Sequence, residues 1–460
     1  MKIMVCVRQG LDGELGPFDA SAYEMALRIP GGEVTLLSMG PATVEEFLRR
    51  QTRLGAKRAV LLCDRVFAGA DTLATAYALS LVVKQLAPDL VLCGRQTLVG
   101  DTGQTGPMLA QLCGYALATN VTRLTPAAEV LRCETRSTGE QSVPCPAVCT
   151  VERTYILRMP GLRSKLGEVE VLTAADLGAD LSRCGLQGSP TRVLRTAENH
   201  TGRRRCTFVS PMELEAVIKA GLDKGSGCVA PPLASEKPLK TVWAVGETVL
   251  PHARAIGTSV KVIPLTDAKA LIEAIRAGDP DAVLWGSDDK SKQLAAQVAA
   301  QLGLGLCADC TGLETDGKVL QMVRPALSGS VIATIKSLTR PAMATVRTRE
   351  QNRQDVLVAA GFGVAKEIDK VKTFTEKIDG ELVTTRKMVD QGVLPYAMQV
   401  GLTGRTVAPP VYIAIGVAGA VHHIVGMQQA GTVIAVNPDP KAPIFDYADY
   451  GIVAEFADCV

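Results

Sequence analysis

The sequence predicts an α/β protein with two related domains built on parallel sheets, followed by a third, C-terminal α/β domain. Short apolar runs typical of strands alternate with segments of helical periodicity along most of the chain. One such strand and helix pattern occurs twice, which indicates two copies of a single domain. The length of 460 residues also favours several domains, because one hydrophobic core stops growing well below this size.

The first 94 residues predict four strands and three helices in alternation. The strands are expected at 2–7, 33–38, 59–63 and 90–93, and the helices at 20–27, 44–54 and 72–86. Such alternation builds a mostly parallel sheet covered by helices. Ligands of such sheets bind at the carboxyl ends of the strands.

Four segments recur in the same order further along the chain. PDLVLCG at 88–94 returns as PDAVLWG at 280–286, and PAVCTV at 146–151 returns as PAMATV at 341–346. Between them AQLCG and TRL (110–114, 122–124) return as AQLG and TGL (300–303, 311–313). The offset stays between 189 and 195, so we expect two copies of one α/β domain.

The second copy begins near Thr241, closes near Arg347 and lacks full counterparts of the early helices. Before it lie the arginine run 203–205, expected to be a solvated surface, and a helix-like segment at 211–220. A third unit has strands at 356–360, 411–415 and 433–436. The expected domains are 1–224, 241–347 and 355–460, with a linker at 225–240.

Composition excludes several classes of function. There are 49 Lys and Arg against 47 Asp and Glu, and 4% aromatic residues, which offers nucleic acid neither a basic surface nor stacking platforms. No apolar stretch reaches the roughly 18–20 residues that cross a bilayer, and the N-terminal apolar run is too short for a signal peptide. We expect a cytoplasmic protein with reduced cysteines that binds neither nucleic acid nor membrane.

Hydrolase motifs are missing from the sequence. It contains no HExxH, no GxSxG and no Walker lysine loop. The CxxC at Cys307 and Cys310 has no second CxxC to complete a zinc site and lies in an apolar segment, so a structural role is expected. No metal site is predicted.

Glycine-rich loops follow two strands of the first copy. The loop GRQTLVGDTGQTGP at 94–107 runs from a strand into a helix, where backbone amides could hold phosphates. Such glycines also serve turn geometry alone. At 64–72 a second turn lies on the same edge, and Asp71 or Thr72 there could cap a helix as readily as contact a nucleotide.

The third unit has two further glycine-rich segments. They occupy 398–409 and 416–423 and bracket the strand at 411–415. The second is a strand, a turn and a helix, an arrangement that places an anion at a helix N-terminus. A hydroxyl, an imidazole and Arg386 would suit a redox-active heterocycle, although a single histidine more often packs or caps.

These segments resemble the electron-transfer flavoprotein family over most of the chain. The first half is similar to its β subunit, through GGEVTLLSMGP at 31–41, residues 64–75, the loop at 94–107 and GLQGSPTRV at 185–193. The second half is similar to the α subunit, through ADCT, RPA, ATI and RPAMATV. MQVGLTG, VAPPVYIAIG, HHIVGM and VNPDPKAPIFDYADYGIV are the most specific matches. The resemblance implies a natural fusion of β-like and α-like halves, with two adenine-nucleotide-binding-like domains and a C-terminal FAD-binding domain.

The resemblance also implies roles for residues around the FAD. Arg386 would lie over the flavin and favour its anionic reduced forms, Thr403 would bond near N5, and His423 would bond the pyrimidine carbonyl. Asn437 and Asp449 would contact the adenosine end. The remaining implied contacts with the flavin and diphosphate are Gln399, Gly401, Gly404, Val407, Gly416, Gly419 and Ala420.

A second nucleotide is implied in the β-like domain. Some family members hold AMP there, and electron-bifurcating members hold a second FAD. The small residues of the loop GDTGQTG favour FAD. The implied contacts are Cys6, Ser38, Asp64, Asp71, Thr72, Thr75, Gly100, Asp101, Thr102, Gln104, Thr105 and Gly106.

The chain departs from the family pattern in three places. Phe362 stands in a GFG turn where the family has a Gly-Arg-Gly type turn, which removes a cation contact, and Ala418 stands where a phosphate-binding serine is usual. Residues 157–169 match the arm that docks on partner dehydrogenases, with Leu162 as its anchor, but this arm is shorter and less basic.

The sequence is consistent with three functions. The first is an electron carrier that takes electrons from a flavin dehydrogenase of the acyl-CoA dehydrogenase type, with domain swivelling about residues 345–355. The second is a bifurcating flavoprotein that oxidises NADH and divides the electrons between ferredoxin or flavodoxin and such a dehydrogenase. The third is a flavin-less nucleotide-binding regulatory protein, suggested by Phe362 and Ala418.

Overall fold

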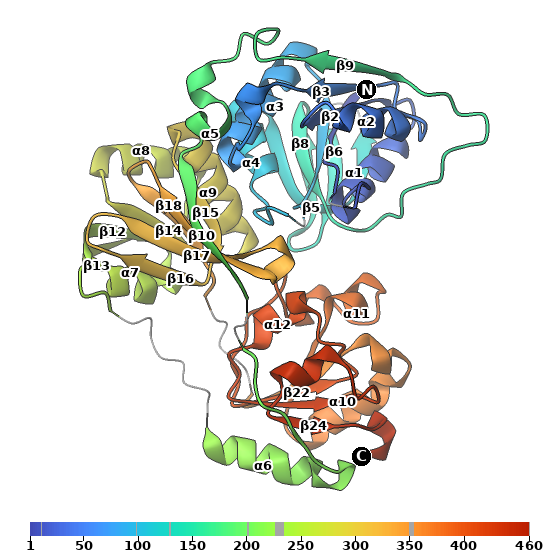
Figure 1. The fold of residues 1–460 in the computed structure, drawn as a ribbon, viewed down its shortest axis with the longest axis vertical. Helices are drawn as coiled ribbons and strands as arrows, with labels where there is room; N and C mark the ends of the chain where they lie inside the picture. Colours follow the sequence, from blue (N-terminus) through green and yellow to red (C-terminus); the bar gives the residue numbers. More distant parts are fainter. Residues whose placement is uncertain are drawn as a thin grey trace. The chain divides into compact units, whose positions relative to one another are not determined.

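The fold consists of two compact units (Figure 1). It was obtained as a computed structural model, which describes residues 1–10, 12–97, 99–127, 130–199, 202–225, 234–348 and 354–459. Unit 1 comprises Met1–Thr196, Ala234–Leu327 and Ala333–Val346, and unit 2 comprises Ala197–Leu233, Ser328–Ile332 and Arg347–Val460. Half of the linker expected at 225–240, residues 226–233, lies outside the described residues. Across the described ranges, no helix has the length and apolar character needed to span a membrane.

A nine-stranded sheet forms the core of the first copy. Its order is β7-β6-β5-β8-β4-β1-β2-β3-β9, and it is parallel except where β6 pairs with β5 and β7. The strands are Lys2–Cys6 (β1), Glu33–Met39 (β2), Arg58–Leu62 (β3), Leu90–Gly94 (β4), Ala116–Ala127 (β5), Val130–Thr135 (β6), Gly139–Pro144 (β7), Ala147–Val151 (β8) and Glu168–Leu172 (β9). The strands and helices predicted for residues 1–94 are confirmed, with ends that differ by one to three residues.

Helices cover both faces of this sheet, which explains why its strands are almost continuously apolar. Ile3 and Val5 pack under one pair of helices, α1 (Pro17–Leu27) and α2 (Val44–Thr52). Met4 points to the opposite face, where α3 (Thr72–Leu86) and α4 (Thr105–Cys113) lie. The short α5 (Gly185–Gly188) follows β9.

The second copy repeats the central strand order of the first. Its sheet is β13-β12-β14-β19-β15, in which β12, β14, β19 and β15 take the places of β1, β4, β8 and β5. The strands are Leu239–Val245 (β12), Gly257–Ile263 (β13), Ala282–Trp285 (β14), Leu306–Cys310 (β15) and Ala342–Val346 (β19), and the helices are Leu250–Ile256 (α7), Ala268–Gly278 (α8) and Asp289–Leu302 (α9). From β13 the chain passes through α8 directly to β14, so the described part of this copy has no equivalent of α2 and β3.

A four-stranded sheet adjoins the two copies. Its order is β10-β18-β17-β16. The strands are Thr191–Glu198 (β10), Gly312–Thr315 (β16), Leu320–Ala326 (β17) and Val331–Ser337 (β18). Through β17 and β18, residues of the second copy line the cavity described below.

A six-stranded parallel sheet organises unit 2. Its order is β11-β24-β23-β22-β20-β21. The strands are Thr207–Phe208 (β11), Val356–Ala360 (β20), Glu381–Thr384 (β21), Val411–Ile415 (β22), Thr432–Val436 (β23) and Tyr450–Ile452 (β24), and the helices are Leu214–Lys224 (α6), Ile368–Lys377 (α10), Arg386–Asp390 (α11) and Val421–Met427 (α12). The strands predicted for the third unit are confirmed.

Residues 202–224 belong to unit 2, not to the first domain, where the boundary at 224 had placed them (Figure 1). The apolar side chains Leu214, Val217 and Ile218 of α6 are buried in the core beneath β22 and β23. A Cβ added at Gly221 would lie 2.8 Å from Val411, so the helix approaches the strands closely. Sequence order alone could not show which sheet this amphipathic helix covers.

Replacing Ile218 with Asp should destabilise unit 2 by roughly 3–5 kcal/mol, because the carboxylate would be buried without a partner. Hydrogen exchange should speed up in β20, β22 and β23, while protection in β1, β4 and β8 should stay unchanged. Ala220→Asp, on the exposed face of the same helix, is the control and should have little effect. Loss of protection in β1 and β4 instead would place α6 with the first copy.

Candidate functional site

The principal cavity of unit 1 lies at the carboxyl ends of β1 and β4 and has a volume of about 1070 Å³. The chain leaves β1 toward β2 on one side, while β4 lies on the other, so the strand order reverses here. In parallel sheets this reversal opens a crevice that binds ligands. Residues of the second copy, including Leu306, Arg324 and Ile335, close the cavity from the opposite side.

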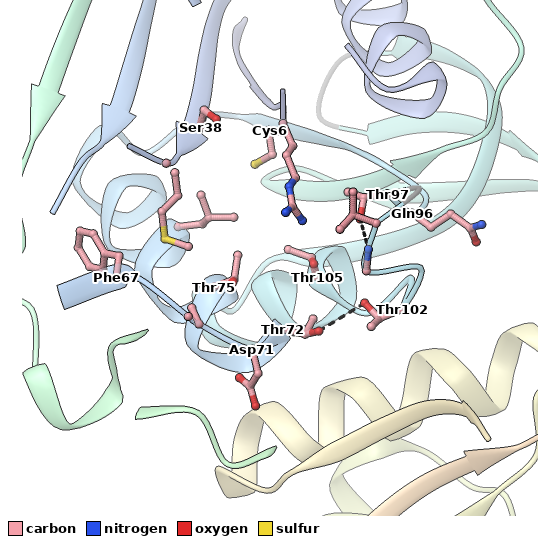
Figure 2. Close-up of a pocket in the computed structure, with 18 of the residues that line it drawn as sticks. Cys6, Ser38, Phe67, Asp71, Thr72, Thr75, Gln96, Thr97, Thr102 and Thr105 are labelled. Carbon is pink, nitrogen blue, oxygen red and sulfur yellow. Dashed lines mark hydrogen bonds between the residues drawn. The ribbon is translucent and has the colours of Figure 1, made fainter. Parts of the chain in front are cut away.

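Strand ends and helix N-termini face each other across the cavity. Figure 2 shows Cys6 and Ser38, at the ends of β1 and β2, opposite Thr75 and Thr105 of α3 and α4. Thr72 Oγ1 and Thr102 Oγ1, which are 3.4 Å apart, join the start of α3 to the glycine-rich loop. The N-terminus of α4, which has no side-chain cap, favours a negatively charged ligand. At the N-terminus of α3, the Asp71 side chain already accepts from two of the amides.

Nine of the twelve residues predicted for the second nucleotide line the cavity: Cys6, Ser38, Asp64, Asp71, Thr72, Thr75, Gly100, Thr102 and Thr105. The other three, Asp101, Gln104 and Gly106, lie behind the loop. Asp101 and Gln104 are buried, and a Cβ at Gly106 would lie 2.3 Å from the Thr150 methyl group on β8. These three residues belong to the loop but do not line the cavity.

Of Asp71 and Thr72, which the sequence left between capping and ligand contact, Asp71 is the helix cap, and Asp64 caps a second turn. Asp71 Oδ1 accepts hydrogen bonds from the amides of Leu73 and Ala74 at 3.0 Å, and Oδ2 accepts from Thr191 Oγ1 at 2.7 Å. In Figure 2 the Asp71 carboxylate points away from Thr75 and Thr105. Asp64 caps the turn after β3 through the amide of Val66 at 3.1 Å. Both carboxylates are therefore engaged by the protein itself.

Sequence reasoning missed Asp19 and Arg324, which also line the cavity. Burial raises the pKa of Asp19 to about 7, although the Arg8 amide that donates to its Oδ2 at 2.9 Å opposes the shift. A Cβ at Gly94 would lie 2.3 Å from Asp19 Oδ1, so a glycine is required at the end of β4. Both residues lie far in sequence from the glycine-rich loop, so no local signal points to them.

In unit 2 the predicted flavin residues gather at the carboxyl edge of the sheet. The strand order reverses at β20, with β21 on one side and β22 on the other. Along this edge, Arg386 follows β21, Phe362 follows β20, the turn 416–420 follows β22 and Asn437 follows β23. Because ligands of parallel sheets bind where the strand order reverses, we expect a ligand between the carboxyl ends of β20 and β22.

Close backbone packing explains the glycines at this edge. A Cβ at Gly361 would lie 2.1 Å from the carbonyl oxygen of Gly416, and one at Gly419, where φ is +94°, would lie 2.2 Å from the amide of Ile444. The turn therefore brings main chain, not side chains, to the strand ends. Ala418 and Ala420 are exposed there.

The loop 399–405 lies against the end of β21. Gln399 Nε2 donates to Thr403 Oγ1 at 2.8 Å, and Tyr396 Oη donates to the Thr403 carbonyl oxygen at 2.6 Å. The Leu402 amide donates to the carbonyl oxygen of His422 at 2.6 Å, which joins the loop to α12. Gly401 and Gly404 permit this path, and Val407 is buried beside it.

His423 is buried within unit 2. Its Nε2 lies 2.9 Å from Tyr412 Oη, and its Nδ1 lies 3.1 Å from the Val400 carbonyl oxygen. Burial lowers the pKa of His423 to about 4, so the ring is neutral at pH 7. The neighbouring His422 is less buried, and burial together with the charge of Arg386 lowers its pKa. His422 is thus the imidazole beside Arg386, which forms an ion pair with Asp390 at 3.3 Å.

Asp449 does not belong to this group, and its assignment to the adenosine end is corrected. It directly precedes β24, at the amino edge of the sheet, where its Oδ2 accepts from the Val433 amide at 2.8 Å. It also pairs with Arg204 at 2.5 Å, so that arginine is largely buried instead of solvated as predicted. The carboxylate that follows β24 on the carboxyl edge is Glu455. Asn437 does lie on that edge, where its Nδ2 donates to the Val417 carbonyl oxygen at 3.0 Å.

Phe362 and Lys387 form a pair at the same edge. The Lys387 ammonium lies 4.1 Å from the centre of the Phe362 ring, within range of a cation–π interaction. Phe362 is 40% exposed. A lysine cation therefore stands beside Phe362, at the turn where the family resemblance leads one to expect an arginine.

The predicted docking arm carries several exposed apolar side chains. Leu162 is fully exposed and Met159 nearly so, and Ile156, which directly precedes the arm, is nearly fully exposed as well. The base of the arm is anchored, because Arg158 Nε lies 2.9 Å from buried Glu24. Although burial opposes it, the hydrogen bonds from Arg158 and Arg28 hold the pKa of Glu24 below its usual value.

Comparison with known families identifies both parts of the chain. Residues 3–177 and 254–373 match the electron transfer flavoprotein domain. Residues 351–428 match the electron transfer flavoprotein FAD-binding domain. The first match covers most of both copies of the repeat, and the second covers the loops that follow β20, β21 and β22 in unit 2.

Curated relatives match different parts of the chain. Protein FixA of Azorhizobium caulinodans is 40% identical over 224 residues, which is 44% of this chain and 79% of the relative. The subunit beta of electron transfer flavoprotein from Thermoanaerobacterium thermosaccharolyticum is 38% identical (43% of this chain, 80% of the relative). The subunit alpha from the same organism is 34% identical (41% of this chain, 71% of the relative). The chain thus joins a β-like part and an α-like part.

Unit 2 should lose about 2 kcal/mol of stability between pH 7 and pH 5 through His423. Its folded pKa of about 4 lies below that of an unfolded histidine, near 6.5, so the contribution is complete above pH 6.5 and declines as the pH falls. Urea unfolding followed by hydrogen exchange in β22 would measure it. His423→Gln should remove most of this dependence, whereas His422→Gln should remove less; equal effects would contradict the burial assigned to His423.

Proposed function

This chain belongs to the electron transfer flavoprotein family, and from that premise we propose that it carries electrons through FAD held at the carboxyl edge of the unit 2 sheet. The proposed donor is a flavin dehydrogenase of the acyl-CoA dehydrogenase type, and a further redox protein is the acceptor. The observation that carries the proposal is that Arg386 and the turn 416–420 follow neighbouring strands at the carboxyl edge of one sheet, with the loop that carries Thr403 beside them, all within the FAD-binding match.

Each group at the crevice suits one part of FAD. Bound FAD would supply the reversible uptake of electrons, and the protein would tune and orient it. The Arg386 guanidinium would stabilise the negative charge that reduction adds, with His422 beside it. The Thr403 hydroxyl, positioned by Gln399, would donate or accept a hydrogen bond at the ring edge. The main chain of Gly416–Gly419 would approach the diphosphate.

Lys387 would supply the cation that the GFG turn lacks. Its ammonium stands over Phe362 at the end of β20, beside the glycine turn after β22. The exposed ring could in turn stack on a planar group of the ligand. These contacts favour a flavoprotein over a flavin-less regulatory protein.

The cavity of unit 1 favours a second candidate function. We propose that it holds a second FAD, because its volume of about 1070 Å³ is at the upper end of the roughly 300–1,000 Å³ usual for cofactor sites. AMP would leave much of this space open. A second FAD would suit oxidation of NADH, with one electron passing toward ferredoxin or flavodoxin and the other toward the FAD of unit 2.

The arm that carries Leu162 is the proposed docking site for the dehydrogenase. An apolar side chain held out in solvent on a base anchored by Glu24 and Arg158 is typical of an interface anchor. The neighbouring apolar residues Ile156 and Met159 would widen the contact.

The purified, full-length chain should be yellow and should release about two FAD per chain on denaturation. Thr75→Trp, which projects a large ring into the unit 1 cavity, should reduce the release to about one FAD, while Thr125→Trp on exposed β5 should not change it. Quantitative chromatography of the released nucleotides makes the measurement. Release of one FAD and one AMP would support the electron-carrier function and contradict the second FAD. Release of no flavin at all would refute both functions.

Leu162→Glu should slow reduction of the bound flavin by a reduced acyl-CoA dehydrogenase by at least about tenfold, because a charge would replace an interface anchor. Stopped-flow absorbance of the flavin would follow the reaction. Leu181→Glu, at an exposed leucine outside the arm, is the control. Equal rates for both variants would remove the arm from the interface.

A further inference from the structure

The CxxC of the second copy spans a β-bulge on β15. Cys307 and Cys310 are partnered with residues of β19 that lie two positions apart, so three steps along β15 match two steps along β19. The extra residue is accommodated at Asp309, where φ is +55°. The Asp309 amide donates to Thr345 Oγ1 at 2.8 Å, which holds the bulge in place. Bulges of this kind redirect side chains and are frequent beside functional sites.

The bulge brings the two thiols together on one face of the sheet. Three steps of a regular strand would span roughly 10 Å and point the side chains to opposite faces. Two steps span roughly 6.6 Å, within the Cα separation of about 4.4–6.8 Å that a disulfide bridges. Both free cysteines accordingly belong to one apolar cluster and are joined by a thiol hydrogen bond, and Cys310 Sγ also donates to the Cys307 carbonyl oxygen at 3.7 Å.

The first copy of the repeat contains the same bulge without the cysteines. On β5 the register shifts between Ala118 and Val121. Asn120, where φ is +58°, donates its amide to Thr150 Oγ1 at 3.0 Å, as Asp309 does in the second copy. The bulge therefore belongs to the shared fold and does not by itself account for a thiol at each end.

The two thiols differ in access and in charge. Cys307 is 3% exposed and lines the unit 1 cavity, whereas Cys310 is entirely buried and does not line it. The hydrogen bond from Cys310 and the charge of Arg324 lower the pKa of Cys307, although burial opposes them. Burial and the bond to Cys307 raise the pKa of Cys310. An accessible thiol of lowered pKa with a buried partner is the arrangement of a reactive cysteine pair.

We propose that Cys307 and Cys310 form a redox-active dithiol that exchanges with small-molecule disulfides entering the cavity. The Cys307 thiolate attacks one sulfur of the incoming disulfide, forms a mixed disulfide and releases one thiol. The Cys310 thiol then gives up its proton, attacks the Cys307 sulfur and releases the second thiol. Two protein thiols are oxidised to one disulfide, one disulfide is reduced to two thiols, and the two cysteine protons pass to the released thiols.

This chemistry needs the cavity only as a route to Cys307. It goes beyond the proposed electron transfer and depends neither on the identity of the nucleotide in unit 1 nor on FAD in unit 2. Its failure would leave both of those proposals untouched.

Mass spectrometry of the full-length chain after exposure to glutathione disulfide tests the proposal. At pH 7, more than about half of the chains should acquire the bond between Cys307 and Cys310 within roughly an hour, and dithiothreitol should reverse it. Both cysteines lie in one tryptic peptide, residues 293–318, which contains no other cysteine. Alkylation of the remaining thiols therefore separates the reduced peptide, the mixed disulfide and the internal disulfide by mass.

Single variants separate the roles of the two thiols. Cys310→Ser should trap the mixed disulfide of Cys307 with glutathione, because the second attacking thiol is missing. Cys307→Ser should accumulate at least about tenfold less mixed disulfide at Cys310, because that thiol is entirely buried. Cys63→Ser, which alters a cavity cysteine outside the pair, is the control and should leave the bond between Cys307 and Cys310 unchanged.

Cys133 and Cys149 show whether the reaction belongs to the folded chain. These two thiols are also joined by a hydrogen bond and are entirely buried, but neither lines the cavity, so they should stay reduced. Oxidation of both pairs at the same rate would mean that the chain must unfold to react, and it would overturn the proposal. A peptide 293–318 that stays reduced, or equal mixed disulfide in the two serine variants of the pair, would overturn it as well. The comparison of the two pairs in the wild-type chain stands even where a variant fails to fold.

Discussion

The reversal of strand order at β1, β12 and β20 is the constraint on which the rest of the molecule depends. Connections run to opposite faces on the two sides of β1, β12 and β20, so the loops at their carboxyl ends part and leave a crevice. The chain builds this crevice three times. What the strand ends carry then decides whether the crevice holds a ligand.

The three crevices have different contents. At β1 and β4, small residues such as Cys6, Cys93 and Gly94 border the large cavity, and the second copy supplies Arg324 to its wall. At the matching place in the second copy, Trp285 replaces Cys93 and is entirely buried, and the side chains of Thr248 and Asp288 close around Gly286. At β20 and β22 the turn is main chain and alanine, flanked by Arg386 and Lys387. The same reversal of strand order thus accompanies a large cavity, a filled core and the proposed FAD site.

Local sequence pattern was sufficient to predict the helices and strands and most of the loops, because apolar runs and glycine-rich turns consist of residues that are adjacent in the chain. The strands of residues 1–94 and the repeat were predictable in this way. The nine predicted residues that line the cavity came from the family resemblance instead. Contacts between segments that lie far apart in the sequence were not predictable from local pattern. The sequence around Arg324 does not indicate that this residue contacts the loop at 100–106. The pattern of α6 was equally consistent with packing on either sheet. Asp449 lies at the amino end of β24, and this could be seen only once the strands were placed in the sheet. The burial of His423 depends on its contacts with Tyr412 and Val400.

A crystal structure of the coloured protein as purified tests the central claim most directly. The account predicts electron density for FAD at the carboxyl edge of unit 2, with the diphosphate beside Gly361 and Gly416, and for a nucleotide in the cavity bordered by Cys6, Gly94 and Arg324. It predicts none between Gly246 and Gly286 of the second copy. A flavin bound at the second copy, or an empty crevice between β20 and β22 in a yellow crystal, would contradict it.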